Sequence, residues 1–248
     1  AEQIENARAR VRKKTDAAKF IAYFQSFTNT YAPVEYLETL FSEAISQPSV
    51  AALSIGTRPD CLPGEVVDLL GRLNKIKPVW VELGLQTIHP DTARYIRRGY
   101  ALAVYEDALR RLKAAGITVI VHVILGLPGE DRERMLQTID YLGGPHRPDG
   151  VKLQLLHVLE GTDLAQDWKE GKFSCMEPGE YYDLLCDCLE RLPPDMVIHR
   201  LTGDGPKRIL LAPLWTGDKK RVLNDLNRTL QRRNVRQGAK YGYMNDEW

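Results

Sequence analysis

The sequence predicts an α/β fold made of consecutive β/α units, arranged as an open doubly wound sheet or as a full or partial (β/α) barrel. Apolar, strand-like segments alternate with amphipathic helical segments between Lys19 and His157. The strand segments are rich in Val, Ile, Leu and aromatic residues, as in parallel strands covered by helices. The expected strands are FIAYFQS, VAALSIG, KPVWVELGLQ, ITVIVHVILG and GVKLQLLHV.

Helical periodicity separates these strands. Apolar residues recur at intervals of three and four, which places them on one face of a helix. Gly116 fits the end of the first such helix. The apolar positions are Leu102, Tyr105, Leu109 and Leu112 in one segment, and Met135, Leu136, Ile139 and Leu142 in the next.

Composition indicates an ordinary globular protein. The chain has 248 residues, 44% hydrophobic and 27% charged, with a formal net charge of +1. No apolar run approaches the length of about 20 residues that a membrane span needs, and the start has no signal-peptide pattern. The four cysteines form neither CxxC pairs nor zinc-type spacings. We therefore expect a cytoplasmic protein without a membrane partner or a disulfide framework.

Strand parity favours the barrel. Alternate strand residues point to opposite faces, and the face under the helices must be apolar. Polar side chains of five strands then lie on the inner face. In a barrel, a polar ligand could form hydrogen bonds with them. In a doubly wound sheet, helices would bury them at a cost of a few kcal/mol for each unpaired group. The predicted inner residues are Tyr23, Gln25, Ser54, Glu82, Gln86, His122, Lys152 and Gln154.

The segments after these strands are turn-like, and barrel chemistry occurs at the carboxyl ends of strands. They read QSFTNT, GTRPD, LQTIHPD, LGLPGED and LEGT. Acidic residues suit the start of a helix. We expect Asp131 to begin the next helix, and for Glu130 a helix-start role and a ligand role stay open.

Taken together, SIGTRPD, VELGLQT, the Arg-Arg-Gly at 97–99, VILGLPGE and LLHVLEGTDL resemble the radical S-adenosylmethionine (SAM) superfamily. The resemblance is to the branch of the oxygen-independent coproporphyrinogen oxidases and the catalytic subunit of Elongator. YFQSFTNTYAPVEYLE, LSIGTRPDCLP and HRLTGDGP followed by APLW resemble the YtqA/YhcC-type family within it.

The resemblance implies a partial (β/α)6 barrel of the TIM-like, radical SAM type with a C-terminal helical extension. Residues 1–160 would form the barrel without its first strand and cluster loop, and residues 161–248 its last elements and the extension. SAM would lie across the strand ends.

The resemblance also assigns cofactor contacts. Gln25 to Asn29, including Thr28, falls at the motif for the methionine amino group, in a form without Gly-Gly-Glu. Gln86 and Arg98 match the residues that hold the SAM carboxylate and ribose, although one of Arg97 and Arg98 could instead face solvent. The remaining expected contacts are Ser54, Thr57 and Glu82, His122 at the position of a ribose-binding aspartate, and Gly126 to Glu130 beside the adenine.

The cluster loop is the main departure from this family. A [4Fe-4S] cluster needs three thiolates in a CxxxCxxC loop, so that one iron stays open to SAM, and the sequence has no such loop. We expect the cluster cysteines upstream of Ala1, and we expect the chain as given to bind SAM weakly and to perform no radical chemistry. The alternative is a barrel that lost its cluster.

Substrate contacts are expected beyond the cofactor. Arg200, Asp204 and Lys207 form a polar group that the resemblance places at the barrel mouth, with a solvated turn as the equal alternative. Lys152 and Gln154 on the inner face and His157 after that strand complete the expected set.

The C-terminal part is locally basic. Eight Lys or Arg and two Asp lie between Gly217 and Tyr241. The helical pattern predicts a buried stripe of Leu223, Leu226 and Leu230, and a second face with Arg221, Arg228 and Arg232. That face is either solvated or follows the phosphates of a nucleic acid.

Three functions remain. The first is a radical SAM enzyme that modifies RNA through a 5′-deoxyadenosyl radical. For this enzyme, the resemblance to the catalytic subunit of Elongator implies tRNA as a partner, with the wobble uridine as the modified base. The enzyme would also need an electron donor such as flavodoxin or ferredoxin. The second is a cluster-free SAM- or nucleotide-binding barrel with a regulatory or scaffold role. The third is an aldolase-like barrel that uses Lys152 as a Schiff-base nucleophile.

Overall fold

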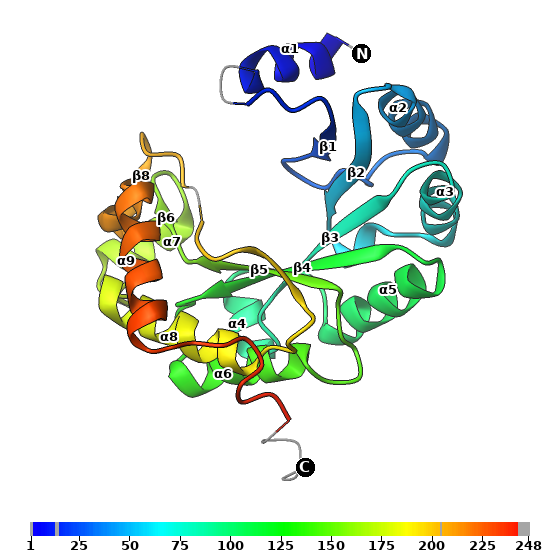
Figure 1. The fold of residues 1–248 in the computed structure, drawn as a ribbon. Helices are drawn as coiled ribbons and strands as arrows, with labels where there is room; N and C mark the ends of the chain where they lie inside the picture. Colours follow the sequence, from blue (N-terminus) through cyan, green and yellow to red (C-terminus); the bar gives the residue numbers. More distant parts are fainter. Residues whose placement is uncertain (1, 13–14, 204, 243–248) are drawn as a thin grey trace. The chain divides into compact units, whose positions relative to one another are not determined.

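The computed structural model describes residues 2–12, 15–203 and 205–242. The chain folds into two compact units. Unit 1 contains residues 1–84 and 100–121, and unit 2 contains residues 85–99 and 122–248. The strands β3 (Val79–Gln86) and β4 (Thr118–Leu125), both labelled in Figure 1, have their first residues in unit 1 and their last in unit 2.

Unit 1 contains the first β/α repeats. Its elements are α1 (Glu2–Val11), β1 (Phe20–Phe24), α2 (Val34–Ser46), β2 (Val50–Thr57), the 3-10 turn η1 (Pro59–Cys61), α3 (Gly64–Asn74) and α5 (Leu102–Ala114). β1 pairs in parallel with β2, and β2 with β3. The outward residues pack on the helices, as in the edge-to-face contact of Phe24 with Phe41 of α2 at 5.0 Å between ring centroids.

Unit 2 contains the later repeats and the C-terminal elements. They are α4 (Pro90–Tyr95), α6 (Arg132–Leu142), β5 (Gly150–Leu155), β6 (Val158–Leu159), α7 (Asp163–Lys169), α8 (Pro178–Arg191), β7 (Val197–Arg200), β8 (Leu210–Ala212), η2 (Leu214–Gly217) and α9 (Lys219–Arg232). β6 and β8 form a small antiparallel sheet, which the sequence pattern did not predict.

The main sheet has the strand order β1-β2-β3-β4-β5-β7. This order follows the chain without the reversal that characterises a doubly wound sheet, so the predicted class of a partial (β/α)6 barrel is confirmed. The predicted apolar faces are also confirmed, since Tyr105, Leu109 and Leu112 of α5 and the four apolar positions of α6 are buried, while Leu102 at the start of α5 is half-buried.

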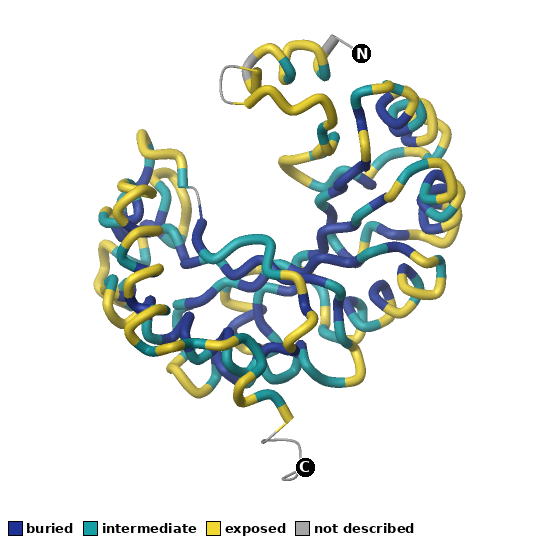
Figure 2. The backbone as a smooth tube through the Cα atoms, in the orientation of Figure 1, coloured by how far each residue is buried: buried dark blue, intermediate teal, exposed yellow. Residues whose placement is uncertain are grey.

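The cores lie under the outward faces of the strands. Leu53, Ile55, Val81 and Leu83 of unit 1 are fully buried, as are Val151 and Leu153 of unit 2. In Figure 2 the strands are mostly dark blue or teal, whereas exposed residues follow the outer sides of the helices. No helix within the described ranges is both long and apolar enough to cross a bilayer.

Candidate functional site

In unit 1, three neighbouring strands direct polar side chains to one carboxylate. Ser54 of β2 donates to Glu82 of β3 at 2.7 Å, and the Tyr23 hydroxyl of β1 donates to the same carboxylate at 2.8 Å. Ser54 and Glu82 are 3% and 5% exposed. The predicted alternation therefore places these three side chains on one face, where the donors offset the desolvation of the carboxylate.

The loop after β1 holds three of the expected ligand residues. Asn29 ties the strand ends together, because its Nδ2 donates to the carbonyls of Phe24 at 3.1 Å and of Gly56 at 2.9 Å. Gln25 is exposed and Thr28 is half-buried. The structure thus gives Asn29 a clear role in shaping this loop, and the cofactor role of all three stays a prediction.

Thr57 has a partner that sequence reasoning missed. Its hydroxyl lies 2.5 Å from that of Thr30, which also donates to the Cys61 carbonyl at 2.5 Å. The only signal in the sequence was the position of Thr30 shortly before the helix α2. Beside it, a cavity of about 760 Å³ is lined mainly by Tyr31, prolines and Leu62.

In unit 2, the inner faces of three strands carry a second polar row. Gln154 of β5 lies 3.2 Å from His122 of β4, Nε2 to Nδ1, and Arg200 of β7 donates to Gln154 Oε1 at 3.4 Å. Lys152, two residues before Gln154, is 7% exposed and lies opposite Arg200 in the register of β5 with β7. His122 is therefore one member of a polar row and not an isolated core histidine.

Gln86 ends β3 with an unusual backbone and a buried amide. Its φ is +67°, in the left-handed region. Its Oε1 is buried and accepts no hydrogen bond from any residue in the described part of the chain. A buried acceptor without a donor is costly, so this oxygen is the strongest local sign of a bound ligand.

The two neighbouring arginines differ sharply. Arg97 is exposed and forms an ion pair with Asp163. Arg98 is 6% exposed, and its Nη1 donates to the carbonyls of Leu85 and Thr87. Arg98 thus faces the end of β3, as expected for a site residue, and Arg97 is the one that faces solvent.

The turn after β4 separates the roles of its two acids. Asp131 caps α6, since its side chain accepts from the Arg134 amide at 2.9 Å. Glu130 instead accepts from the Thr87 hydroxyl at 2.5 Å, and burial raises the pKa of its carboxyl despite that hydrogen bond. The helix-start role is confirmed for Asp131, whereas Glu130 forms a hydrogen bond with Thr87, the residue that follows β3.

Gly126 begins this turn with a φ of +79°. A Cβ there would lie 3.2 Å from the sulfur of Met176, so both conformation and space favour glycine. Its contact with adenine stays a prediction.

The expected substrate residues are dispersed. His157 is half-buried and lies close to Gly203 and Gly205, because a Cβ on Gly205 would lie 2.8 Å from its Nδ1 and one on Gly203 would lie 3.0 Å from its Cε1. Lys207 is exposed, and Asp204 lies outside the described residues. Of the six predicted residues, the structure brings Lys152, Gln154 and Arg200 together on β5 and β7.

α9 presents a basic face, and its buried stripe was predicted correctly at Leu226, which is buried, but wrongly at Leu223, while Leu230 is half-buried. Leu223 is 39% exposed, and the buried residues are Val222, Leu226 and Thr229. Thr229 can be buried because its hydroxyl donates back to the Asp225 carbonyl at 3.0 Å and needs no solvent. The predicted basic residues Arg221, Arg228 and Arg232 are exposed.

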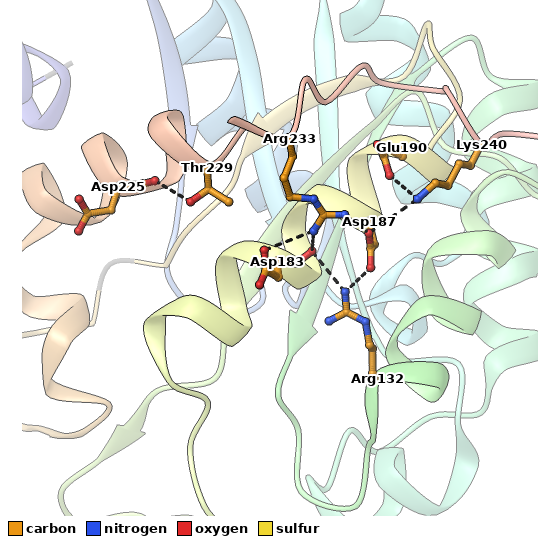
Figure 3. Close-up of polar contacts among 8 residues, drawn as sticks. All are labelled: Arg132, Asp183, Asp187, Glu190, Asp225, Thr229, Arg233 and Lys240. Carbon is orange, nitrogen blue, oxygen red and sulfur yellow. Dashed lines mark hydrogen bonds and ion pairs between the residues drawn. The ribbon is translucent and has the colours of Figure 1, made fainter. Parts of the chain in front are cut away.

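Ion pairs fix the end of α9 against α8 (Figure 3). Arg233 donates to Asp187 at 2.7 Å, and Lys240 pairs with Glu190 at 2.5 Å. Arg132 at the start of α6 also pairs with Asp187. These contacts hold the segment after α9 against α8 and α6, and the side chains of Arg221 and Arg228 on α9 are 79% exposed.

The described residues contain no group of side chains that could hold an iron-sulfur cluster. Among residues 2–12, 15–203 and 205–242, no three His, Cys, Asp or Glu side chains are grouped so that they could hold a metal ion. Burial raises the pKa of Cys175 to about 11 and raises that of Cys188. Both thiols are therefore protonated at neutral pH.

The residues of unit 2 fit SAM. SAM carries an ammonium group, a carboxylate and ribose hydroxyls, and it needs both donors and acceptors from the protein. The unpartnered Gln86 oxygen supplies a buried acceptor, and the row of His122, Gln154 and Arg200 supplies further polar groups on the inner face. Gln86, His122 and the turn from Gly126 are the residues that would hold it.

Comparisons with known proteins agree with this geometry. Residues 1–142 match the Radical SAM superfamily, and residues 148–232 match the Radical_SAM C-terminal domain. The chain is 41% identical over 245 residues to YtqA of Bacillus subtilis, covering 99% of this chain and 76% of YtqA. It is 36% identical over 227 residues to YhcC of Escherichia coli, covering 91% and 73%.

Among solved structures, the chain is similar to the archaeal Elp3 of Methanocaldococcus infernus with a TM-score of 0.82. That match has 21% sequence identity and covers 95% of this chain but 59% of the solved Elp3 chain, which lacks its residues 1–46, so it shows the fold. Together with the sequence relatives, it establishes the predicted resemblance. The chain belongs to the radical SAM superfamily, in the family that includes YtqA and YhcC.

Proposed function

We propose that this protein is a SAM-dependent radical enzyme that modifies RNA, with SAM held at the strand ends of unit 2. The observation that carries the SAM part is the buried Gln86 oxygen without a donor. In the superfamily, SAM and a [4Fe-4S] cluster together supply hydrogen-atom abstraction after one-electron reduction, for which flavodoxin or ferredoxin is the proposed donor.

The residues of this chain bind and orient the cofactor. Gln86 accepts a hydrogen bond from it, and His122 and Gln154 present polar groups from the adjacent strands β4 and β5. The apolar residues on the opposite faces, such as Val123 and Leu153, exclude water from the wall behind them. The site is therefore built to hold a polar ligand against a rigid sheet.

SAM binding is tested directly by calorimetry on the chain. We expect the wild type to bind SAM weakly, because the sequence has no cluster loop, and Gln86→Ala to bind about tenfold more weakly still, because one buried hydrogen bond is lost. Gln166→Ala is the matched control, since Gln166 is an exposed glutamine on α7. No binding by the wild type, or equal binding by Q86A, would contradict the proposed site.

Radical chemistry is tested on the natural gene product under anaerobic conditions. After reconstitution with iron and sulfide, we expect a brown protein that releases 5′-deoxyadenosine from SAM when dithionite is added. A colourless protein that binds SAM without cleaving it would favour the cluster-free scaffold.

The RNA part of the proposal is supported by the basic face of α9. The side chains of Arg221 and Arg228 are each 79% exposed, and they share one acidic neighbour, Asp225. Two arginines around one carboxylate leave a net positive charge, which attracts phosphates. The resemblance to the catalytic subunit of Elongator makes tRNA, at its wobble uridine, the proposed substrate.

Charge reversal tests this surface. We expect Arg221→Glu with Arg228→Glu to weaken tRNA binding at least about tenfold and to reduce the salt dependence of the affinity. Lys75→Glu with Arg110→Glu makes the same charge change at exposed positions in unit 1 and should have little effect. Equal weakening of tRNA binding by both double variants would mean that only the total charge matters, and it would contradict a binding surface on α9. Mass spectrometry of tRNA nucleosides from a deletion strain then tests the wobble position.

A further inference from the structure

The chain turns sharply at Gln86. Its φ is +67°, and the Thr87 amide donates to the Leu85 carbonyl at 2.9 Å, which closes a three-residue γ-turn. A turn of this kind is strained for any residue with a side chain. Something in the surrounding structure must therefore hold Gln86 in it.

Arg98 contacts both sides of this turn. One nitrogen, Nη1, donates to the Leu85 carbonyl at 3.0 Å and to the Thr87 carbonyl at 2.6 Å. The two carbonyls flank Gln86, and a single bridging nitrogen holds them on the same side. Arg98 is itself fixed, because it is 6% exposed and its amide donates to the Ala93 carbonyl at 2.9 Å.

Thr87 anchors the far side of the turn. It is fully buried, its hydroxyl donates to Glu130 at 2.5 Å, and it accepts from the His89 amide at 3.0 Å. The backbone on either side of Gln86 is thus fixed by side chains from the turn before α6 and from the segment after α4.

We infer that Arg98 is a positioning residue that holds Gln86 in the left-handed turn, so that the Gln86 amide oxygen meets a hydrogen-bond donor of bound SAM. This inference rests on the proposed SAM site and goes beyond it. An amide oxygen only accepts, so its partner is the ammonium group or a ribose hydroxyl and not the carboxylate. Arg98 acts on the ligand through Gln86.

A double-mutant cycle in SAM affinity separates this role from direct contact. The lysine nitrogen lies one bond closer to the backbone than Nη1 of arginine and would not reach both carbonyls, so we expect Arg98→Lys to weaken SAM binding about tenfold, as Gln86→Ala does. If Arg98 acts through Gln86, the double variant binds no more weakly than Q86A alone. Additive losses would show direct contact by Arg98 and overturn the inference. Arg94→Lys, at an exposed arginine of α4, is the matched control.

A second cycle uses stability and does not need SAM. Glycine adopts positive φ without strain, so Arg98→Lys should lower the melting temperature clearly in the wild type and much less in a Gln86→Gly background. Equal losses in both backgrounds would overturn the inference. If the wild type fails to bind SAM, the proposed function fails, while this stability cycle still decides whether Arg98 holds the turn.

Discussion

The hydroxyl of Ser54 donates a 2.7 Å hydrogen bond to the carboxylate of Glu82, between neighbouring strands of unit 1. Both residues are buried, so the carboxylate depends on protein donors in place of water. This pair shows that the polar inner face is internally satisfied at this point and that each donor has a measurable effect on stability.

Removing this donor should destabilise the fold. We expect Ser54→Ala to lower the free energy of unfolding by about 1–3 kcal/mol, because a buried carboxylate loses a partner. Chemical denaturation followed by circular dichroism measures the change. Ser46→Ala is the control, since Ser46 is exposed and bonds only a helix carbonyl. Its cost should stay within about 0.5 kcal/mol, and similar costs for both variants would refute the assignment.

The contact of Gln154 with His122 predicts a specific tautomer. An amide nitrogen only donates, so Nδ1 of His122 accepts and the ring proton lies on Nε2. We expect long-range ¹H–¹⁵N spectra to show this tautomer in the wild type and a shifted Nδ1 signal in Gln154→Leu. Unchanged His122 signals in that variant would mean that the hydrogen bond is absent, and Gln166→Leu serves as the control.

The half-buried Glu130 predicts a pH dependence of stability. Its pKa is raised in the folded state by burial, which outweighs the bond from Thr87. Between the ordinary glutamate pKa and the raised value, the folded state binds more protons than the unfolded state, so stability falls as pH rises through this window.

Glu130→Gln keeps an acceptor for Thr87 but cannot ionise. We expect the variant to gain stability relative to the wild type as pH rises above about 4.3, and to show no difference of slope below it. Denaturation at a series of pH values measures the difference between the two proteins. A constant difference across the series would show that the Glu130 pKa is not raised.

Gly205 should tolerate no side chain. A Cβ at this position would lie 2.8 Å from His157 Nδ1, so Gly205→Ala must displace the ring. We expect a loss of about 1–3 kcal/mol, measured by thermal or chemical unfolding. Gly179 has no atom within 4 Å of an added Cβ, and Gly179→Ala should be close to neutral. Equal effects of the two alanines would show that His157 moves aside freely.

The inner polar residues were predictable because strand parity is fixed by backbone geometry. Once Leu53 and Ile55 face the helices, Ser54 can only face inward, and the same reasoning places His122 and Gln154. Because successive side chains of a strand point to opposite faces, the face of each polar residue follows from that of its apolar neighbours. It can therefore be predicted from one sequence.

Other features depend on contacts between distant segments. The left-handed turn at Gln86 is held by Arg98 and Thr87, and no local pattern in LQT indicates a positive φ. The buried side of α9 was misjudged at Leu223, because leucine was expected to be buried whichever way the helix packs. Its orientation instead follows from the ion pairs of Arg233 with α8, whose partners lie far away in sequence.

The chain enters and leaves unit 1 twice, and this has a consequence for synthesis on the ribosome. Residues 1–84 are made before residues 85–99 of unit 2, but unit 1 is complete only after residues 100–121 have emerged as well. A nascent chain that ends among residues 85–99 therefore contains an incomplete unit 1 followed by a short segment of unit 2. Neither unit can be cut out as one continuous fragment, so autonomous folding of either half would require a rearranged gene.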